Sequence, residues 1–153
     1  MSIVNINYRG RIARLSDISH IDFTNKSSPQ MHIHKCHDGI TIIIFKTGKC
    51  RIMGCKTPLS TLTNLPYNIH LQCIQSATAT YDYGSLINLQ ALSLHTPHVM
   101  FEPELFPAAR LQQFNPLCVN VFASGKIVIT GLKTLHIKKR ISEICYVLNT
   151  TFF

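Results

Sequence analysis

A duplicated segment is the feature that most constrains the fold of this chain. Residues 45–56 read Phe-Lys-Thr-Gly-Lys-Cys-Arg-Ile-Met-Gly-Cys-Lys, and residues 122–133 read Phe-Ala-Ser-Gly-Lys-Ile-Val-Ile-Thr-Gly-Leu-Lys. Both copies carry Phe, Gly, Lys, Ile, Gly and Lys at the same six positions, at a constant offset of 77 residues (122 − 45). A period near half of the 153-residue length predicts two related halves. Each copy predicts a β-hairpin, because an apolar strand, a Thr-Gly or Ser-Gly turn and a second strand follow one another.

Alternating and apolar runs on either side of the repeat predict further strands. We expect strands over residues 2–8, ended by Gly10, and over 67–80. Two three-stranded meanders are expected, at residues 31–36, 40–45 and 50–53 and at residues 109–114, 117–122 and 127–130. The order of elements predicts an antiparallel sheet with helices on a single face.

Helices are expected at four places. Ser16 caps a short helix over residues 16–21, and Gly84-Ser85 caps a second one through Leu86, Leu89 and Leu92. Thr134 caps a longer helix whose apolar stripe has a 3.6-residue period and consists of Ile137, Ile141, Ile144 and Leu148. The equivalent helix of the first half, between Pro58 and Pro66, has room for only about two turns.

Charge favours a polyanionic partner. The chain has fifteen Lys and Arg and seven Asp and Glu, which gives a net charge of +8. This excess of positive charge favours nucleic acid as the partner. A basic surface that serves solubility alone would have the same composition. No secretory signal or membrane-spanning run is found in the sequence, so the six cysteines are expected as reduced thiols in the nucleus or cytoplasm.

The run Glu102-Pro-Glu-Leu-Phe-Pro107, followed by residues 122–133, closely resembles the second repeat of the TATA-box-binding protein family. Residues 40–56 resemble the first repeat of that family, and Ser2-Ile-Val4 stands where its opening strand begins. The resemblance implies an α+β saddle in which two pseudo-symmetric repeats, residues 1–66 and 67–153, form one curved antiparallel sheet with helices on the convex face. The trimmed first-half helix and short loops would suit a compact viral or otherwise fast-evolving version of the family.

The resemblance also implies a transcription initiation factor that bends duplex DNA through the minor groove. Phe106 and Phe122 match the wedge phenylalanines of the second repeat and Phe45 matches one of the first, while Ser28 occupies the fourth wedge position. The matching base contacts are Val128 and Thr130, and the family's two central asparagines fall on Ser2 and Gln72. The remaining DNA-face positions are Val4, Ile74, Asn120 and Arg51, and Lys49, Lys126, Lys56 and Lys133 are expected to contact phosphates.

Departures from the family pattern are concentrated in the first half. Arg51 and Met53 replace the partners of Val128 and Thr130, and Asn120 replaces an apolar contact in the second half. We therefore expect either a changed preference for DNA sequence or a first half that contacts only the DNA phosphates. For a single phenylalanine, core packing is the competing interpretation.

The loop around Glu102, Glu104 and Leu105 is expected to contact a transcription factor IIB-type protein, as the resemblance implies; a charged loop that keeps the sheet edge soluble is the alternative. A zinc site at His32, His34 and Cys36 is weighed and not adopted, because these residues are strung along one strand without a second ligand pair. No cofactor is expected, and the absence of nucleophile, phosphate-loop or acid–base motifs argues against an enzyme.

Two other functions stay open at this point. The same fold can serve as a protein-interaction module of a transcription or viral complex in which DNA binding is weakened or lost. Alternatively, its aromatic rings can stack on the bases of single strands or RNA–DNA hybrids.

Overall fold

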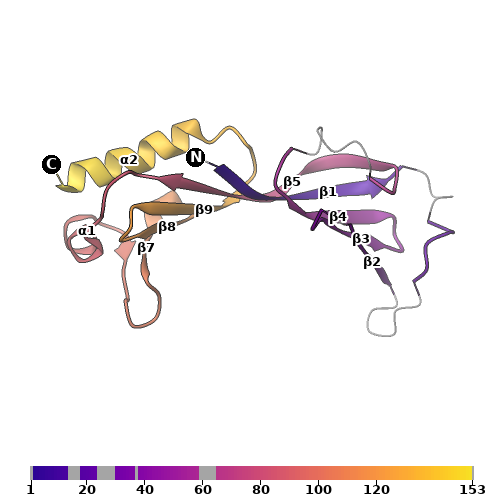
Figure 1. Ribbon diagram of the computed structural model, residues 1–153, viewed down its shortest axis with the longest axis horizontal. Helices are drawn as coiled ribbons and strands as arrows, with labels where there is room; N and C mark the ends of the chain where they lie inside the picture. The colour runs from indigo at the N-terminus through magenta and orange to yellow at the C-terminus, as the bar shows by residue number, and fades with distance from the viewer. Residues whose placement is uncertain (1, 14–17, 24–29, 37, 59–64, 153) are drawn as a thin grey trace. The chain divides into compact units, whose positions relative to one another are not determined.

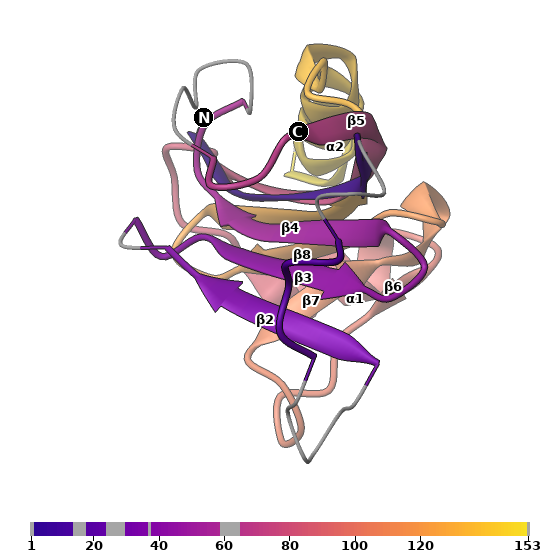
Figure 2. The same cartoon turned by 90° about the vertical axis from the view of Figure 1, so that its right-hand side faces the viewer.

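The computed structural model describes residues 2–13, 18–23, 30–36, 38–58 and 65–152 (Figures 1 and 2). The chain divides into two compact units, which we call the first-half unit, Val4–Ala77, and the second-half unit, Met1–Ile3 together with Thr78–Phe153. Two long strands, β1 (Ser2–Ile12) and β5 (Ile69–Asp82), contribute residues to both units. The repeat boundary expected between residues 66 and 67 stays a prediction.

The first-half unit contains the predicted meander. Strands β2 (Met31–Lys35), β3 (Thr41–Phe45) and β4 (Lys49–Cys55) pair antiparallel and lie side by side, and the hydrogen-bonded order continues through β1 to β5 (Figure 2). The turn between β3 and β4 is closed by the amide of Gly48, which donates to the carbonyl of Phe45 (2.8 Å). Gly48 has φ +78° and its repeat equivalent Gly125 has φ +85°, so the repeated glycine is explained by a turn that L-residues rarely adopt.

The expectation that Gly10 ends the first strand is wrong, because β1 continues to Ile12. At Gly10 the strand lies close to β5. A Cβ added there would stand 2.9 Å from both the carbonyl oxygen of His70 and Cγ2 of Ile69. Glycine is therefore present for close approach of two backbones and not for a turn.

The second-half unit has the strand order β5-β9-β8-β7-β6. Strands β7 (Ala108–Leu111), β8 (Cys118–Phe122) and β9 (Lys126–Leu132) form the predicted antiparallel meander, and the two-residue strand β6 (Val99–Met100), which was not predicted, pairs antiparallel with β7. The strand expected over residues 109–114 is shorter, because Gln112–Phe114 form a 3₁₀ helix. Pro116, two residues after Phe114, has no amide hydrogen to donate to a sheet ladder.

Both helices for which the structure gives bounds belong to the second-half unit. Helix α1 (Leu89–His95) is capped by Asn88, whose side chain accepts from the amide of Ala91 (3.0 Å), so the cap predicted at Gly84-Ser85 is wrong. Helix α2 (Lys138–Phe152) begins later than predicted, and the Thr134 hydroxyl accepts from the His136 amide (3.2 Å) in the preceding loop. No helix in the described ranges is long and apolar enough to cross a membrane.

Helix α2 lies along one side of the strands of its unit (Figure 1). Its predicted stripe is largely confirmed: Ile144 and Leu148 are buried, as is Ile137 just before the helix. Alternate residues of β8 and β9 are buried as well, namely Val119, Val121, Ile127 and Ile129. Since successive strand residues point to opposite faces, the residues between them form a second face, which carries the candidate site.

Two of the predicted helices lie partly outside the described residues. Residues 14–17 and 59–64 lie outside the described residues, so the start of the 16–21 helix and most of the shortened first-half helix are not described. Within 18–21, the Ile21 amide donates to the Ile18 carbonyl (3.0 Å), which forms one turn.

Candidate nucleic-acid interface

The sheet face of the second-half unit brings together three of the predicted base contacts. Asn120 of β8 stands opposite Val128 of β9, and Cys118 stands opposite Thr130, so Asn120, Val128 and Thr130 share one face. All three are partly exposed, whereas the intervening Val119, Val121, Ile127 and Ile129 are buried. The thiol of Cys118 contacts Oδ1 of Asn120 at 3.7 Å, which orients the amide within this face.

Phe122 ends β8 on the same face and pairs with Phe106. Their ring centroids are 6.1 Å apart with an interplanar angle of 64°, an edge-to-face contact. Phe106 is 44% exposed and Phe122 is partly exposed. Neither ring is packed in the core, so the competing interpretation as core phenylalanines is wrong for this pair.

Two exposed residues extend this face and were missed by sequence reasoning. The register places Met100 opposite Arg110 and Arg110 opposite Asn120, which makes a cross-strand row that ends at Val128. Met100 and Arg110 are both exposed. Neither residue lies in the duplicated segment: the pairing of β7 with β8 brings Arg110 into the row, and the pairing of β6 with β7 adds Met100.

The predicted phosphate contacts are on the surface. Lys49, Lys56, Lys126 and Lys133 are all exposed. Ser2 is exposed too, and its hydroxyl lies 2.8 Å from the hydroxyl of Thr80.

In the first-half unit the equivalent face is more cationic. Arg51 of β4 stands between Ile43 of β3 and Arg9 of β1, and Thr41 stands opposite Met53. Arg51 and Met53 are exposed, and Phe45 is partly exposed opposite Met31. Ser28, the fourth wedge position, lies outside the described residues.

A hollow of about 540 Å³ opens on this face. Its lining is mainly cationic and polar. The described residues that line it include one aromatic ring and no carboxylate; they are Arg9, Phe45, Thr47, Lys49, Cys50, Arg51 and Gln72. The predicted contacts Phe45, Lys49, Arg51 and Gln72 thus come together, whereas Arg9 was not anticipated. Val4 is 42% exposed and Ile74 is partly exposed, and neither lines the hollow.

Burial also shapes the chemistry of the thiol in this hollow. Burial raises the pKa of the Cys50 thiol to about 11, and a hydrogen bond with the backbone of Gly10 lowers this pKa by a smaller amount. Burial likewise raises the pKa of Cys55. These two thiols are protonated at neutral pH, so they contribute no negative charge to the face.

The loop before β7 presents the predicted partner contacts. Glu102, Glu104 and Leu105 are exposed, Leu105 to 79%. The carbonyl of Glu102 accepts from the amides of Leu105 (3.0 Å) and Phe106 (2.9 Å). This turn is fixed by backbone hydrogen bonds and leaves the side chains of the loop available.

The histidines of β2 are engaged by other groups. Nδ1 of His32 donates to the carbonyl of Asp22 (2.7 Å), and the Tyr67 hydroxyl lies 3.4 Å from Nε2. The ring of His34 packs edge-on against Tyr67, with centroids 5.4 Å apart. No group of three or more potential metal ligands occurs among the described residues, and His37 lies outside them.

Fold and site together define an α+β sheet protein with a basic, aromatic exposed face, the kind of surface that binds nucleic acid. Residues 72–150 match the family model described as transcription factor TFIID (or TATA-binding protein, TBP), which is just over half of the chain. The chain belongs to the TATA-binding protein family.

Curated relatives agree with this assignment. The chain is 34% identical over 124 residues to a TATA-box-binding protein-like 1 of Entamoeba histolytica, an alignment that covers 71% of the chain and 57% of the relative. It is 32% identical over 123 residues to the TATA-box-binding protein of Tetrahymena thermophila, covering 71% and 50% respectively. The chain thus spans about half the length of these relatives.

A solved structure confirms the fold. The TBP of Methanococcus jannaschii superposes with a TM-score of 0.76, covering 97% of this chain and 98% of that one, at 24% sequence identity. The predicted α+β class and TATA-binding protein fold are therefore correct.

Proposed function

We propose that this chain is a TATA-binding-protein-like transcription initiation factor that binds duplex DNA in the minor groove and bends it. The observation that carries the proposal is the exposed pair Phe106–Phe122 beside Val128 and Thr130, on the sheet face away from the buried helix contacts. Apolar rings that enter a base step unstack it and kink the duplex, a mechanism for which this family is the reference case. Small apolar contacts suit A·T pairs, which lack the guanine amino group.

The partners follow from the same proposal. An AT-rich promoter-like duplex is the ligand, and a transcription factor IIB-type protein binds at the loop of Glu102, Glu104 and Leu105, which brings in the polymerase machinery. The site of action is the nucleus, or a cytoplasmic transcription site for a viral protein. Since two rings serve the second half and Phe45 serves the first, the bend is stronger under the second half.

Fluorescence energy transfer across a doubly labelled duplex tests the proposal. Wild type should bring the two ends of an AT-rich duplex closer together, and Phe122→Ala should abolish that change. Tyr146→Ala is the matched control, because it removes an aromatic ring that is 69% exposed on helix α2. A duplex that stays straight with the wild-type protein bound would contradict the proposal.

A second candidate function is supported by the first half. Arg51 and Met53 stand where the family places small contacts, and both are exposed, which supports a protein-interaction module with weak DNA binding. Under that alternative, Phe122→Ala leaves partner binding intact and wild type fails to bend the duplex. Binding that is confined to single strands and weakened by Phe122→Ala would instead support base stacking.

A further inference from the structure

The exposed face of the first-half unit places like charges directly opposite one another. The β1–β4 register pairs Arg9 with Arg51 and Arg11 with Lys49. Arg9 and Arg11 are two residues apart on one strand, and Lys49 and Arg51 are two apart on the other, so all four cations share one face. We call these four residues the cationic block.

Such an arrangement is unfavourable unless something neutralises it. Like charges directly opposite each other on antiparallel strands destabilise a sheet. All four side chains are exposed, and within the described part of the chain none of them forms an ion pair. A bound anion would remove the repulsion, since each guanidinium presents a planar fork of donors that matches phosphate oxygens.

The hollow beside the block has the composition of an anion site. Three of the four cations line it together with Thr47 and Gln72, and among the described residues no carboxylate does. The buried Cys50 thiol, with its pKa raised to about 11, adds no negative charge. Over the whole first-half range, residues 4–77 hold nine Lys and Arg against three Asp, which is +6 of the net +8.

We propose that the cationic block is a phosphate site that holds the sugar–phosphate backbone of nucleic acid without reading bases. Arg9 and Arg11 are thereby assigned a binding role beside Lys49 and Arg51. For duplex DNA the inference rests on the proposed function and deepens it: base discrimination belongs to the second-half face, and the first half supplies sequence-independent affinity. A phosphate backbone fits better than an acidic protein segment, because forked donors, a hydroxyl and an amide surround a hollow that also holds the Phe45 ring.

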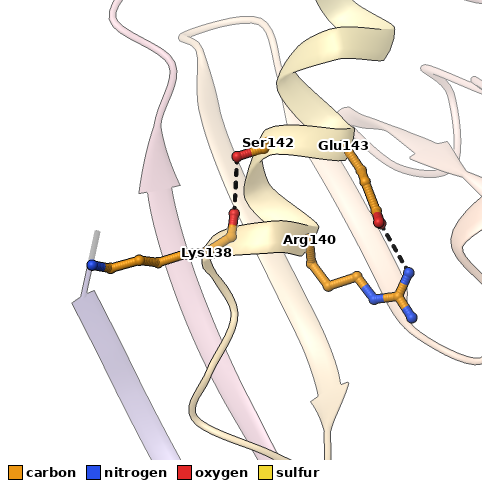
Figure 3. Close-up of polar contacts among 4 residues, drawn as sticks. All are labelled: Lys138, Arg140, Ser142 and Glu143. Carbon is orange, nitrogen blue, oxygen red and sulfur yellow. Dashed lines mark hydrogen bonds and ion pairs between the residues drawn. The ribbon is translucent and has the colours of Figure 1, made fainter.

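The main test removes the positive charges of Arg9 and Arg51, which stand opposite each other. The full-length Arg9→Gln/Arg51→Gln variant is compared with Lys138→Gln/Lys139→Gln, which removes two exposed charges from α2. Arg140 is unsuitable as a control because it already pairs with Glu143 (2.8 Å), whereas the side chain of Lys138 points away from that pair (Figure 3). Fluorescence anisotropy is recorded with an AT-rich and a GC-rich duplex between 50 and 300 mM salt.

We expect the Arg9→Gln/Arg51→Gln variant to make the negative slope of log affinity against log salt shallower by about 2. Binding at 0.1 M salt should weaken about tenfold or more. Both duplexes should lose affinity equally, so that the AT-to-GC ratio is unchanged. Its melting temperature should stay equal or rise, because repulsion is relieved. A slope change no larger than that of the α2 control, or a changed AT-to-GC ratio, would overturn the inference.

A second measurement separates the site from the proposed function. Nitrogen-15 spectra of the arginine Nε groups are followed during titration with inorganic pyrophosphate and, separately, with an octaglutamate peptide. Shifts of Arg9 and Arg51 with pyrophosphate support the phosphate site even for a protein that bends no duplex. Shifts with the peptide alone, or with neither probe, overturn it.

Discussion

The rings of Phe106 and Phe122 meet edge to face, with centroids 6.1 Å apart, although the two residues lie 16 positions apart (122 − 106) along the chain. Phe122 ends strand β8, and Phe106 belongs to the loop that leads into β7, where Ala108 stands opposite Phe122. Each ring thus supports the orientation of the other on an exposed surface. For the proposed minor-groove binding, holding both rings in place beforehand lowers the entropy cost of forming the complex.

A double-mutant cycle measures this contact. Phe106→Ala and Phe122→Ala, singly and together, should show a coupling free energy of unfolding of about 0.5–1.5 kcal/mol, the range for edge-to-face pairs. Urea unfolding of the four proteins gives the value. Combining Phe122→Ala with Tyr146→Ala on α2 should instead be additive, and additivity of the two phenylalanine changes would contradict the pairing.

The residue at position 10 should tolerate no added carbon. In Gly10→Ala the new Cβ meets the His70 carbonyl and the Ile69 side chain at 2.9 Å, so β1 and β5 must move apart, at a cost of about 1–3 kcal/mol. Gly10→Val should cost more, because its branches add to the same overlap. Chemical denaturation of both variants checks this order, and equal stability of all three proteins would show that the strands are not in close contact there.

Local patterns were sufficient for the position of most strands and for the part of the exposed face that lies in the duplicated segment. The duplicated segment places Phe122, Val128 and Thr130 by alternation alone, because a strand has a period of two and its buried partners are apolar. Contacts distant in sequence were not predictable in this way. Glycine is a typical turn residue, yet the role of Gly10 depends on its contact with the backbone of β5. Arg9 joins the proposed phosphate site only through its register with Arg51.

The cap of helix α1 shows a second limit of sequence reading. Gly84, Ser85 and Asn88 are all residues that cap helices, and the structure selects Asn88. Asn88→Ala should cost about 1 kcal/mol, since the Ala91 amide loses its acceptor. Ser85→Ala is the control and should stay within about 0.5 kcal/mol of wild type. Thermal unfolding measures the stability of both variants. A larger loss of stability for Ser85→Ala than for Asn88→Ala would support the cap at Gly84-Ser85 that the sequence predicts.

The raised pKa of the Cys50 thiol predicts that the free energy of unfolding decreases at alkaline pH. Its pKa is raised from 9.0 to about 11, mainly by burial, so the unfolded chain loses this proton at lower pH than the folded one. The contribution of the protonated Cys50 thiol to the free energy of unfolding is complete below about pH 8 and is lost as pH rises from about 9 to about 11. The destabilisation caused by Cys50→Ala should therefore shrink by about 2 kcal/mol between pH 8 and pH 10.5.

Urea unfolding of wild type and Cys50→Ala at the two pH values measures this difference. Comparing the two proteins at each pH cancels the titration of the other groups. Cys73→Ala is the control, because Cys73 is exposed. A Cys50→Ala effect that is the same at both pH values would show that the thiol is open to solvent.

The exposed loop gives a prediction about the partner. Leu105 is 79% exposed, and the loop is held by the Glu102 carbonyl, which accepts two backbone amides. Leu105→Ser should therefore leave the free energy of unfolding within about 0.5 kcal/mol of wild type and leave duplex bending unchanged. Because an apolar anchor contributes strongly to an interface, binding of a transcription factor IIB-type protein to the DNA complex should weaken about tenfold or more. Gel-shift titration measures this loss against Leu86→Ser, a change at a leucine that is 86% exposed outside the loop; an equal loss in both variants would show that the loop is not the contact.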